Sequence, residues 1–229
     1  MANILFDALF GHHLGQDTDF IIRPEAPVIS HGDFLRMASR IAHVFKAAGL
    51  KPGDRVAVQV AKSPEALALY AAALQAGVIF LPLNTAYTVE ELRYFIEDSG
   101  AGLVICDPAS AADLGSVCTA LGAQLMTLDA AGGGSLMDAA GTMPDQFDPV
   151  PRDADDLAAL LYTSGTTGRS KGAMLTHNNL LTNARGLADI WRFGPDDVLL
   201  NALPIFHTHG LFVASNVILL AGGSMIFLP

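Results

Sequence analysis

Short apolar runs that are typical of buried β-strands alternate with helical patterns along most of this 229-residue chain. Residues 103–106 are apolar throughout, whereas residues 33–48 carry apolar side chains at three- and four-residue spacing. Strands that are apolar along their whole length are buried on both faces, and strands that alternate with helices are typical of parallel pairing. The chain is therefore predicted to have an α/β fold, in which mostly parallel sheets are covered by helices.

Helix boundaries are marked by capping residues. Ser63 before Pro64 predicts a helix start, and Gly77 predicts its end. Thr88 followed by Glu91 predicts a capping box and a helix that runs to about Ser99. By the same reasoning we expect further helices at 109–121 and 177–191, and strands at 56–60, 78–81, 157–162, 198–203 and 205–206.

Residues 130–156 interrupt this alternation. The segment contains three consecutive glycines, at 132–134, and three prolines. Glycine and proline are the strongest markers of turns and loops. The segment is therefore predicted to be a loop or linker, and it is the best candidate for an internal boundary.

The charge balance excludes one class of partner and indicates a covered surface. With 13 Lys and Arg against 23 Asp and Glu, the net charge is −10, and an acidic chain repels the phosphates of a nucleic acid, so no nucleic-acid partner is expected. Charged residues make up 16% of the chain, against about 25% in typical soluble domains. We therefore expect part of the surface to be covered in the complete protein.

Compartment and membrane signals point to a cytoplasmic location. The two cysteines, Cys106 and Cys118, form no disulfide framework or metal-binding spacing, and the first residues lack the pattern of a secretory signal. Residues 211–229 contain no charge and approach the length of a membrane span. Gly222 and Gly223 interrupt them, however, so a buried helix followed by a buried strand is the preferred interpretation, with a membrane span as the alternative.

The segment 163–172 carries the argument about function. A buried apolar strand leads directly into glycines, hydroxyl side chains and two cations, Arg169 and Lys171. Glycines let backbone N–H groups approach a ligand, and hydroxyl and ammonium groups bind phosphate oxygens. The alternative is a solvent-exposed flexible linker that binds no ligand. The spacing does not fit a Walker A loop, a dinucleotide fingerprint or a nucleophile elbow.

Residues 162–172, with the sequence YTSGTTGRSKG, resemble the signature phosphate loop of the adenylate-forming superfamily, which contains acyl-CoA synthetases, peptide-synthetase adenylation domains and luciferases. Residues 204–210, PIFHTHG, resemble the next motif of that superfamily, and residues 51–56 and 77–84 are similar to its first subdomain. Residues 84–88, NTAYT, together with the His-Thr-His-Gly segment are most similar to malonyl-CoA synthetases.

The resemblance implies an ATP-dependent acid–CoA ligase, with malonate as the preferred acid and coenzyme A as co-substrate. It implies that His207 lies near the carboxylate or the acyl adenylate, and that Thr163 also helps to bind Mg²⁺. For His207 the alternatives are a structural histidine or a metal pair with His209. The resemblance assigns the ATP phosphates to Thr163, Ser164, Gly165, Thr166, Thr167, Gly168 and Lys171.

The resemblance covers the whole chain but only part of the family's length. It implies that residues 1–229 are the N-terminal part of the large AMP-binding domain, an incomplete layered fold without the C-terminal lid domain. The missing half of the enzyme is then a partner, and the fragment alone is expected to be inactive. The alternatives are an acyl-CoA synthetase for a medium-chain or aromatic acid, and a nucleotide-binding fragment without catalysis.

Overall fold

The computed structural model describes residues 2–163 and 170–228. In chain order the elements are α1 (Ile4–Leu9), η1 (Gly11–His13), β1 (Asp19–Ile22), β2 (Ile29–Ser30), α2 (His31–Ala47), β3 (Arg55–Gln59), α3 (Pro64–Ala76), β4 (Ile79–Pro82), α4 (Val89–Ser99), β5 (Leu103–Cys106), η2 (Pro108–Ser110), α5 (Ala111–Leu121), β6 (Gln124–Thr127), α6 (Ser135–Ala140), β7 (Leu157–Thr163), β8 (Lys171–Thr176), α7 (His177–Trp191), β9 (Val198–Asn201), η3 (His209–Ser215), α8 (Asn216–Ala221) and β10 (Ser224–Phe227).

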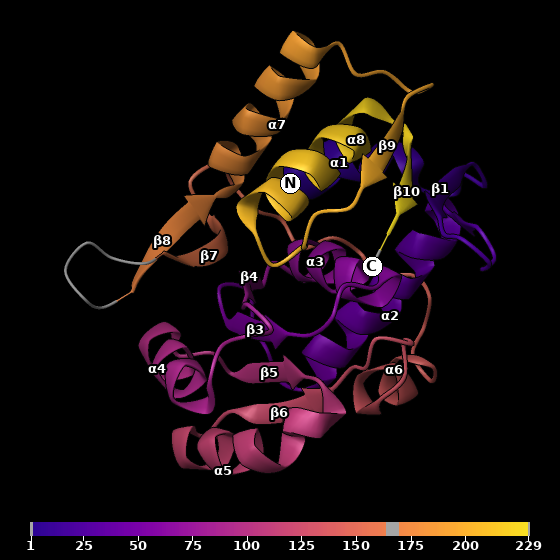
Figure 1. Cartoon of the computed structure of the whole chain (residues 1–229). Coiled ribbons are helices and arrows are strands. Elements are labelled where there is room, and N and C mark those ends of the chain that lie inside the picture. The colour runs from indigo at the N-terminus through magenta and orange to yellow at the C-terminus, as the bar shows by residue number, and fades with distance from the viewer. Residues whose placement is uncertain (1, 164–169, 229) are drawn as a thin grey trace.

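The described strands form two sheets (Figure 1). The six-stranded sheet has the order β6-β5-β3-β4-β7-β8, and the four-stranded sheet has the order β2-β1-β10-β9. Neighbouring strands are parallel except for the pairs β1–β2 and β7–β8. The predicted α/β fold with mostly parallel, helix-covered sheets is therefore confirmed.

Helices α2 and α3 lie between the two sheets (Figure 1). Helix α3 is apolar around its whole circumference, and nearly all of its residues are buried, as expected for a helix with structure on every side. Tyr70 of α3 packs against Phe80 of β4 on one side and Phe212 of η3 on the other. On the opposite face of the six-stranded sheet, α4 and α5 cover a second apolar cluster.

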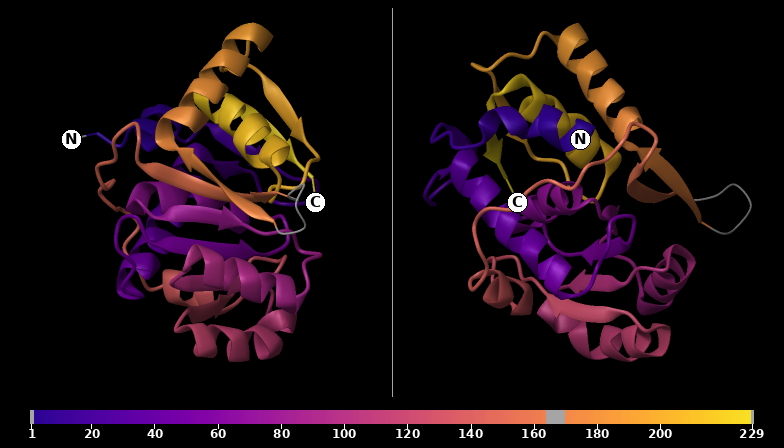
Figure 2. Two further views of the ribbon diagram at one scale, coloured as in Figure 1. Left: turned by 90° about the vertical axis from the view of Figure 1, so that its left-hand side faces the viewer. Right: turned by 180° about the vertical axis from the view of Figure 1, so that it is seen from behind.

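Both sheets combine strands from either side of residues 130–156. Strand β7 pairs with β4, and β10 pairs with β1. Helices α1 and α8 therefore lie side by side although they come from opposite ends of the chain (Figure 2). The segment 130–156 is a loop that also contains the short helix α6.

Most of the predicted elements are present with small changes of boundary. Ser63, Gly77 and the Thr88–Glu91 capping box occupy their predicted cap positions. The strand expected at 205–206 is wrong, because those residues form a turn, and the strand expected at 198–203 ends at Asn201. Within the described residues 211–228 there are a helix, a break at the two glycines and a strand, as preferred for the segment 211–229. None of the helices in the described part of the chain combines the length and apolar character needed to cross a bilayer.

Candidate functional site

A cavity of about 340 Å³ lies at the carboxyl ends of β4 and β7. In open α/β sheets, ligands bind beyond the carboxyl ends of the strands. The cavity brings Thr163 and His207, two of the predicted site residues, into one lining although 44 residues separate them in the sequence. The lining consists of Pro82, Asn84, Tyr87, Leu161, Tyr162, Thr163, Phe206, His207 and Thr208.

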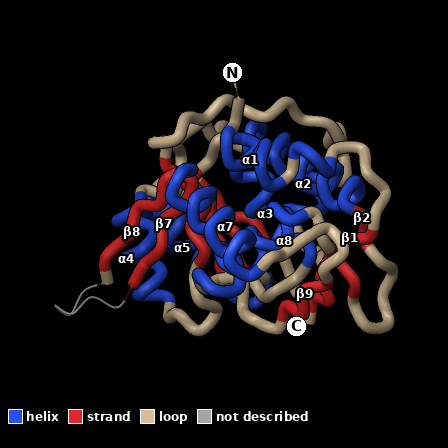
Figure 3. Tube along the Cα trace, turned by 90° about the horizontal axis from the view of Figure 1, so that it is seen from above, coloured by secondary structure: helices blue, strands red, loops and turns tan. Residues whose placement is uncertain are grey.

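The predicted phosphate loop joins β7 to β8. Thr163 at the end of β7 pairs with Lys171 at the start of β8, and both residues are exposed. Figure 3 shows the two strands at one end of the molecule, with α4 beside them. Five predicted phosphate ligands, Ser164, Gly165, Thr166, Thr167 and Gly168, lie outside the described residues, so their assignment stays a prediction.

Helix α4 anchors the strands on both sides of that loop. The Tyr94 hydroxyl donates to Ser170 O at 2.9 Å, just before β8. The Tyr162 hydroxyl of β7 donates to Asp98 Oδ2 at 2.6 Å, and the Tyr162 ring packs on Phe95 at 4.5 Å between centroids. Burial and the Asp98 carboxylate raise the pKa of Tyr162 well above its usual range, so its phenol remains a donor at neutral pH.

No pattern in the sequence singles out these α4 residues as part of the site. An aromatic or acidic side chain on an amphipathic helix has the pattern of an ordinary surface or core position. The contacts of Tyr94 and Asp98 with β8 and β7 arise only when the helix packs beside the hairpin.

The wall of the cavity after β4 is a turn held by a buried amide. Gln59 Nε2 donates to Asn84 O at 3.0 Å and to Tyr87 O at 3.1 Å. Gln59 is buried at the end of β3, where its amide needs partners. The Asn84 side chain accepts from Ala86 N at 2.9 Å. This turn belongs to the NTAYT segment and lines the same cavity as His207 and Thr208.

His207 reaches the cavity from the loop between β9 and η3. Its main-chain N–H donates to Pro204 O at 3.4 Å, and its carbonyl accepts from Leu211 N at 3.0 Å. The side chain is exposed, and within the described ranges no group hydrogen-bonds to its imidazole. The ring is therefore available to a ligand that enters the cavity.

The described residues include no cluster of three or more His, Cys, Asp or Glu side chains that would hold a metal ion. None of the described residues that line the cavity is acidic, and Thr163 offers a single hydroxyl. Magnesium accepts oxygen ligands and usually keeps several waters and substrate phosphates. A metal bound mainly by a nucleotide is compatible with this lining.

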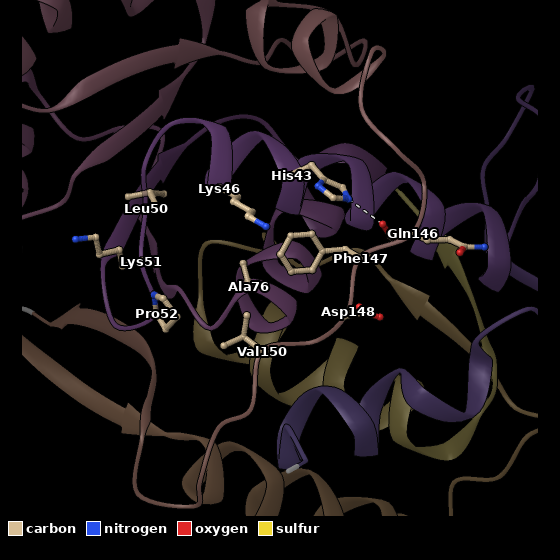
Figure 4. Close-up of a pocket in the computed structure, with 10 residues that line it drawn as sticks. All are labelled: His43, Lys46, Leu50, Lys51, Pro52, Ala76, Gln146, Phe147, Asp148 and Val150. Carbon is tan, nitrogen blue, oxygen red and sulfur yellow. Dashed lines mark hydrogen bonds between the residues drawn. The ribbon is translucent and has the colours of Figure 1, made fainter.

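A larger cavity, of about 570 Å³, lies near the amino ends of β3 and β4. Its lining comes from the end of α2, the turn before β3, the end of α3 and residues 146–150 (Figure 4). His43 Nε2 donates to Gln146 O there at 2.8 Å. The carboxyl ends of α2 and α3 carry the negative ends of their helix dipoles, and Lys46 and Lys51 in the lining offset that negative charge. Among the residues that the structure describes, no predicted site residue lines this cavity.

Comparison with protein families gives a match over most of the chain. The model of the family described as "AMP-binding enzyme" matches residues 15–229. Among curated proteins, the feruloyl-CoA synthase of Amycolatopsis sp is 37% identical over 210 residues, which are 89% of this chain and 41% of that protein. The mitochondrial malonate–CoA ligase of Bos taurus is 33% identical over 159 residues, which are 69% of this chain and 26% of that protein.

Solved structures give a similar result. The ATP-bound structure of MatB from Rhodopseudomonas palustris has a TM-score of 0.96 and 53% sequence identity, and the match covers 100% of this chain and 46% of that one. The apo structure of the same protein has a TM-score of 0.96 and 52% identity. The chain thus spans less than half the length of these relatives.

Proposed function

Since the chain belongs to the family of AMP-binding enzymes, we propose that it forms the N-terminal part of the large AMP-binding domain of an acid–CoA ligase. The observation that carries the proposal is the shared cavity, whose lining includes both Thr163, the first residue of the predicted phosphate loop, and His207. A carboxylic acid activated by ATP has to be held with its carboxylate beside the nucleotide, which is the arrangement that such a cavity provides.

The proposed reaction has two steps. A carboxylate oxygen of the acid attacks the α-phosphorus of ATP, the bond to the bridging oxygen breaks, and pyrophosphate leaves. The thiol of coenzyme A then attacks the acyl carbon of the adenylate, loses its proton and displaces AMP. Neither step requires a nucleophile from the protein, so the work of the protein is positioning and charge stabilisation.

The residues of this chain serve positioning and charge stabilisation in the following way. Thr163 and Lys171, together with residues 164–168, hold the β- and γ-phosphates, and the ammonium of Lys171 offsets part of their charge. The hydroxyl of Thr163 is an oxygen ligand for Mg²⁺, which neutralises phosphate charge when it is bound. His207 donates a hydrogen bond to the carboxylate or to the acyl adenylate.

Malonate is the proposed acid. It is favoured by the resemblance of residues 84–88 and 207–210 to malonyl-CoA synthetases and by the similarity to the malonate–CoA ligase of Bos taurus. The similarity to the feruloyl-CoA synthase supports an aromatic acid as the alternative substrate. The competing proposal is a nucleotide-binding fragment without catalysis of its own.

Thioester formation by the intact enzyme on malonate, methylmalonate, octanoate and a cinnamate tests the choice of acid. We expect turnover with malonate. Octanoate or the cinnamate reacting while malonate gives no thioester would overturn that choice. ATP–pyrophosphate exchange by this chain alone tests whether it forms an acyl adenylate without the rest of the enzyme, and we expect little or no exchange.

A further inference from the structure

The loop that carries His207 is tied at both ends to one buried hydroxyl. Asn201, the last residue of β9, donates from Nδ2 to Ser215 Oγ at 3.2 Å. Ser215 Oγ donates to Gly210 O at 2.8 Å. The Asn201 and Ser215 side chains are 1% and 0% exposed. Buried hydrogen bonds of this kind restrict a loop strongly, because an unmade bond has a high cost there.

The main chain couples His207 to these two hydrogen bonds of Ser215. Its carbonyl accepts from Leu211 N at 3.0 Å, next to the carbonyl of Gly210 that Ser215 binds. A displacement of Asn201 or Gly210 therefore moves the backbone from which the imidazole projects.

Lys62 joins this closed loop to the six-stranded sheet. It lies between β3 and α3, and its Nζ donates to Asn201 O at 2.6 Å and to Asn201 Oδ1 at 3.2 Å. The same Nζ lies 4.5 Å from the centroid of the Phe227 ring in β10, within the range of a cation–π contact. One ammonium thus contacts β9 and β10, two neighbouring strands of the four-stranded sheet.

Stability alone does not account for an ammonium at this position. Lys62 is half-buried, and none of the carboxylates in the described ranges forms an ion pair with it. Burial lowers the pKa of Lys62 to about 8. A methionine would fill the same space without the cost of desolvating a charge. The ammonium instead supplies directed hydrogen bonds, because its N–H groups fix the positions of the carbonyl oxygen and the side-chain amide oxygen of Asn201.

We propose that Lys62 is a positioning residue for His207. Through Asn201 and Ser215 it holds residues 202–209 so that the imidazole faces the cavity that Thr163 shares. This inference rests on the proposed function in one respect, namely that His207 contacts the acid or its adenylate.

The test replaces Lys62 by methionine in the intact enzyme and measures ligand binding and turnover separately. We expect kcat/KM for the carboxylic acid to fall about tenfold to 100-fold, as for a catalytic contact displaced by about 1 Å. The Kd for ATP is expected to change by less than about twofold, because the predicted phosphate loop joins β7 to β8, whereas Lys62 contacts β9 and β10. Lys62→Arg restores part of the loss, since a guanidinium also donates to both oxygens of Asn201.

A spectroscopic measurement separates positioning from general structure. The imidazole resonance of His207 is expected to shift or broaden in Lys62→Met, while that of His43 on α2 stays in place. Lys51→Met is the matched control, because Lys51 is an exposed lysine in the turn before β3, at the amino end of that strand. It should leave the His207 resonance, the ATP affinity and turnover unchanged.

Two outcomes overturn the inference. One is an unchanged His207 resonance with parental kcat/KM in Lys62→Met. The other is a parallel loss of melting temperature, ATP affinity and turnover, which indicates a purely structural role. If His207→Ala retains full activity, the proposed role of His207 fails, and the His207 resonance in Lys62→Met still decides whether Lys62 positions the loop.

Discussion

At the scale of single residues, Lys171 combines an exposed side chain with a fixed backbone. It starts β8 and pairs with Thr163, so its ammonium projects from the base of the predicted phosphate loop without taking part in core packing. This separation between a charged group and the hydrophobic core makes its role testable without unfolding the protein.

Lys171→Ala is expected to weaken ATP binding about tenfold to 100-fold, the effect of losing a hydrogen bond to a charged group. The melting temperature should stay within a few degrees of the parent, since exposed side chains contribute little to stability. Isothermal titration calorimetry with ATP and a thermal melt measure the two effects. Lys51→Ala is the control, and equal ATP affinity in the two variants would contradict the assignment.

Buried histidines make the stability of the chain sensitive to mild acid. The rings of His13 and His31 stack with their centroids 3.7 Å apart, and their Nε2 atoms donate to Leu219 O and Gly223 O. Burial lowers the pKa of both groups to about 4, from an ordinary value of about 6.5. Between these two values the unfolded chain binds more protons than the folded chain, so stability falls as the pH decreases from about 6.5 to about 4.

We expect the free energy of unfolding to fall by about 2 to 4 kcal/mol between about pH 7.5 and about pH 5, measured by urea denaturation. Carboxylates remain ionised in most of this range, so histidine protonation dominates the change. His13→Gln keeps a donor for Leu219 O and removes one titrating group, and it should flatten the pH dependence. Equal urea midpoints for the parent at both pH values would contradict the prediction.

At the scale of elements, the loop from β9 to η3 depends on close backbone packing. A Cβ atom built at Gly210 would collide with Pro204 O, whereas one built at Gly186 on α7 meets nothing within 4 Å. The loop therefore reaches its observed course only with glycine at 210, and His207 lies inside it. Helix α7 has no such restriction.

Gly210→Ala is expected to lower the free energy of unfolding by about 1 to 3 kcal/mol, the usual cost of a forced backbone shift. Gly186→Ala should leave it unchanged or raise it by up to about 1 kcal/mol, because alanine favours the helix. Urea denaturation of the two variants provides the comparison. Identical midpoints would show that the loop tolerates a Cβ at position 210.

Elements with explicit terminal signals were predictable from the sequence. Helix α4 has its capping box and α3 has its serine, proline and glycine, because these local hydrogen bonds do not depend on distant residues. Strand β6 and helix α1 were missed. Strand β6 mixes polar and apolar residues at the edge of a sheet, and α1 has only six residues, so neither has a strong periodic pattern.

At the scale of the whole molecule, apolar side chains are exposed around one sheet edge. Strand β9 ends the four-stranded sheet, and its residues Val198 and Leu200 are 54% and 62% exposed. Trp191 at the end of α7 is half-exposed as well. An apolar edge strand with unpaired backbone groups is a site for association with other chains. This surface agrees with the low fraction of charged residues.

We expect the chain by itself to self-associate as its concentration rises, with Leu200→Lys reducing that association, because a charge on an edge strand opposes pairing. Size-exclusion chromatography with light scattering measures the mass against the 24.0 kDa of one chain. Val28→Lys, beside the opposite edge strand β2, is the control. A parent that remains monomeric over the whole concentration range would contradict the prediction.

The sequence by itself determined the fold class, the cap residues and the candidate phosphate loop. Apolar strands, helix caps and runs of glycine and hydroxyl residues can be recognised because each depends on residues that are neighbours in the sequence. Only the tertiary structure brought His207 and Thr163 into one cavity, placed Tyr94 and Asp98 of α4 beside the β7–β8 hairpin and joined Lys62 to Asn201. These contacts link residues 44 to 139 positions apart. Such distances are decided by how helices and sheets pack, which no local pattern specifies.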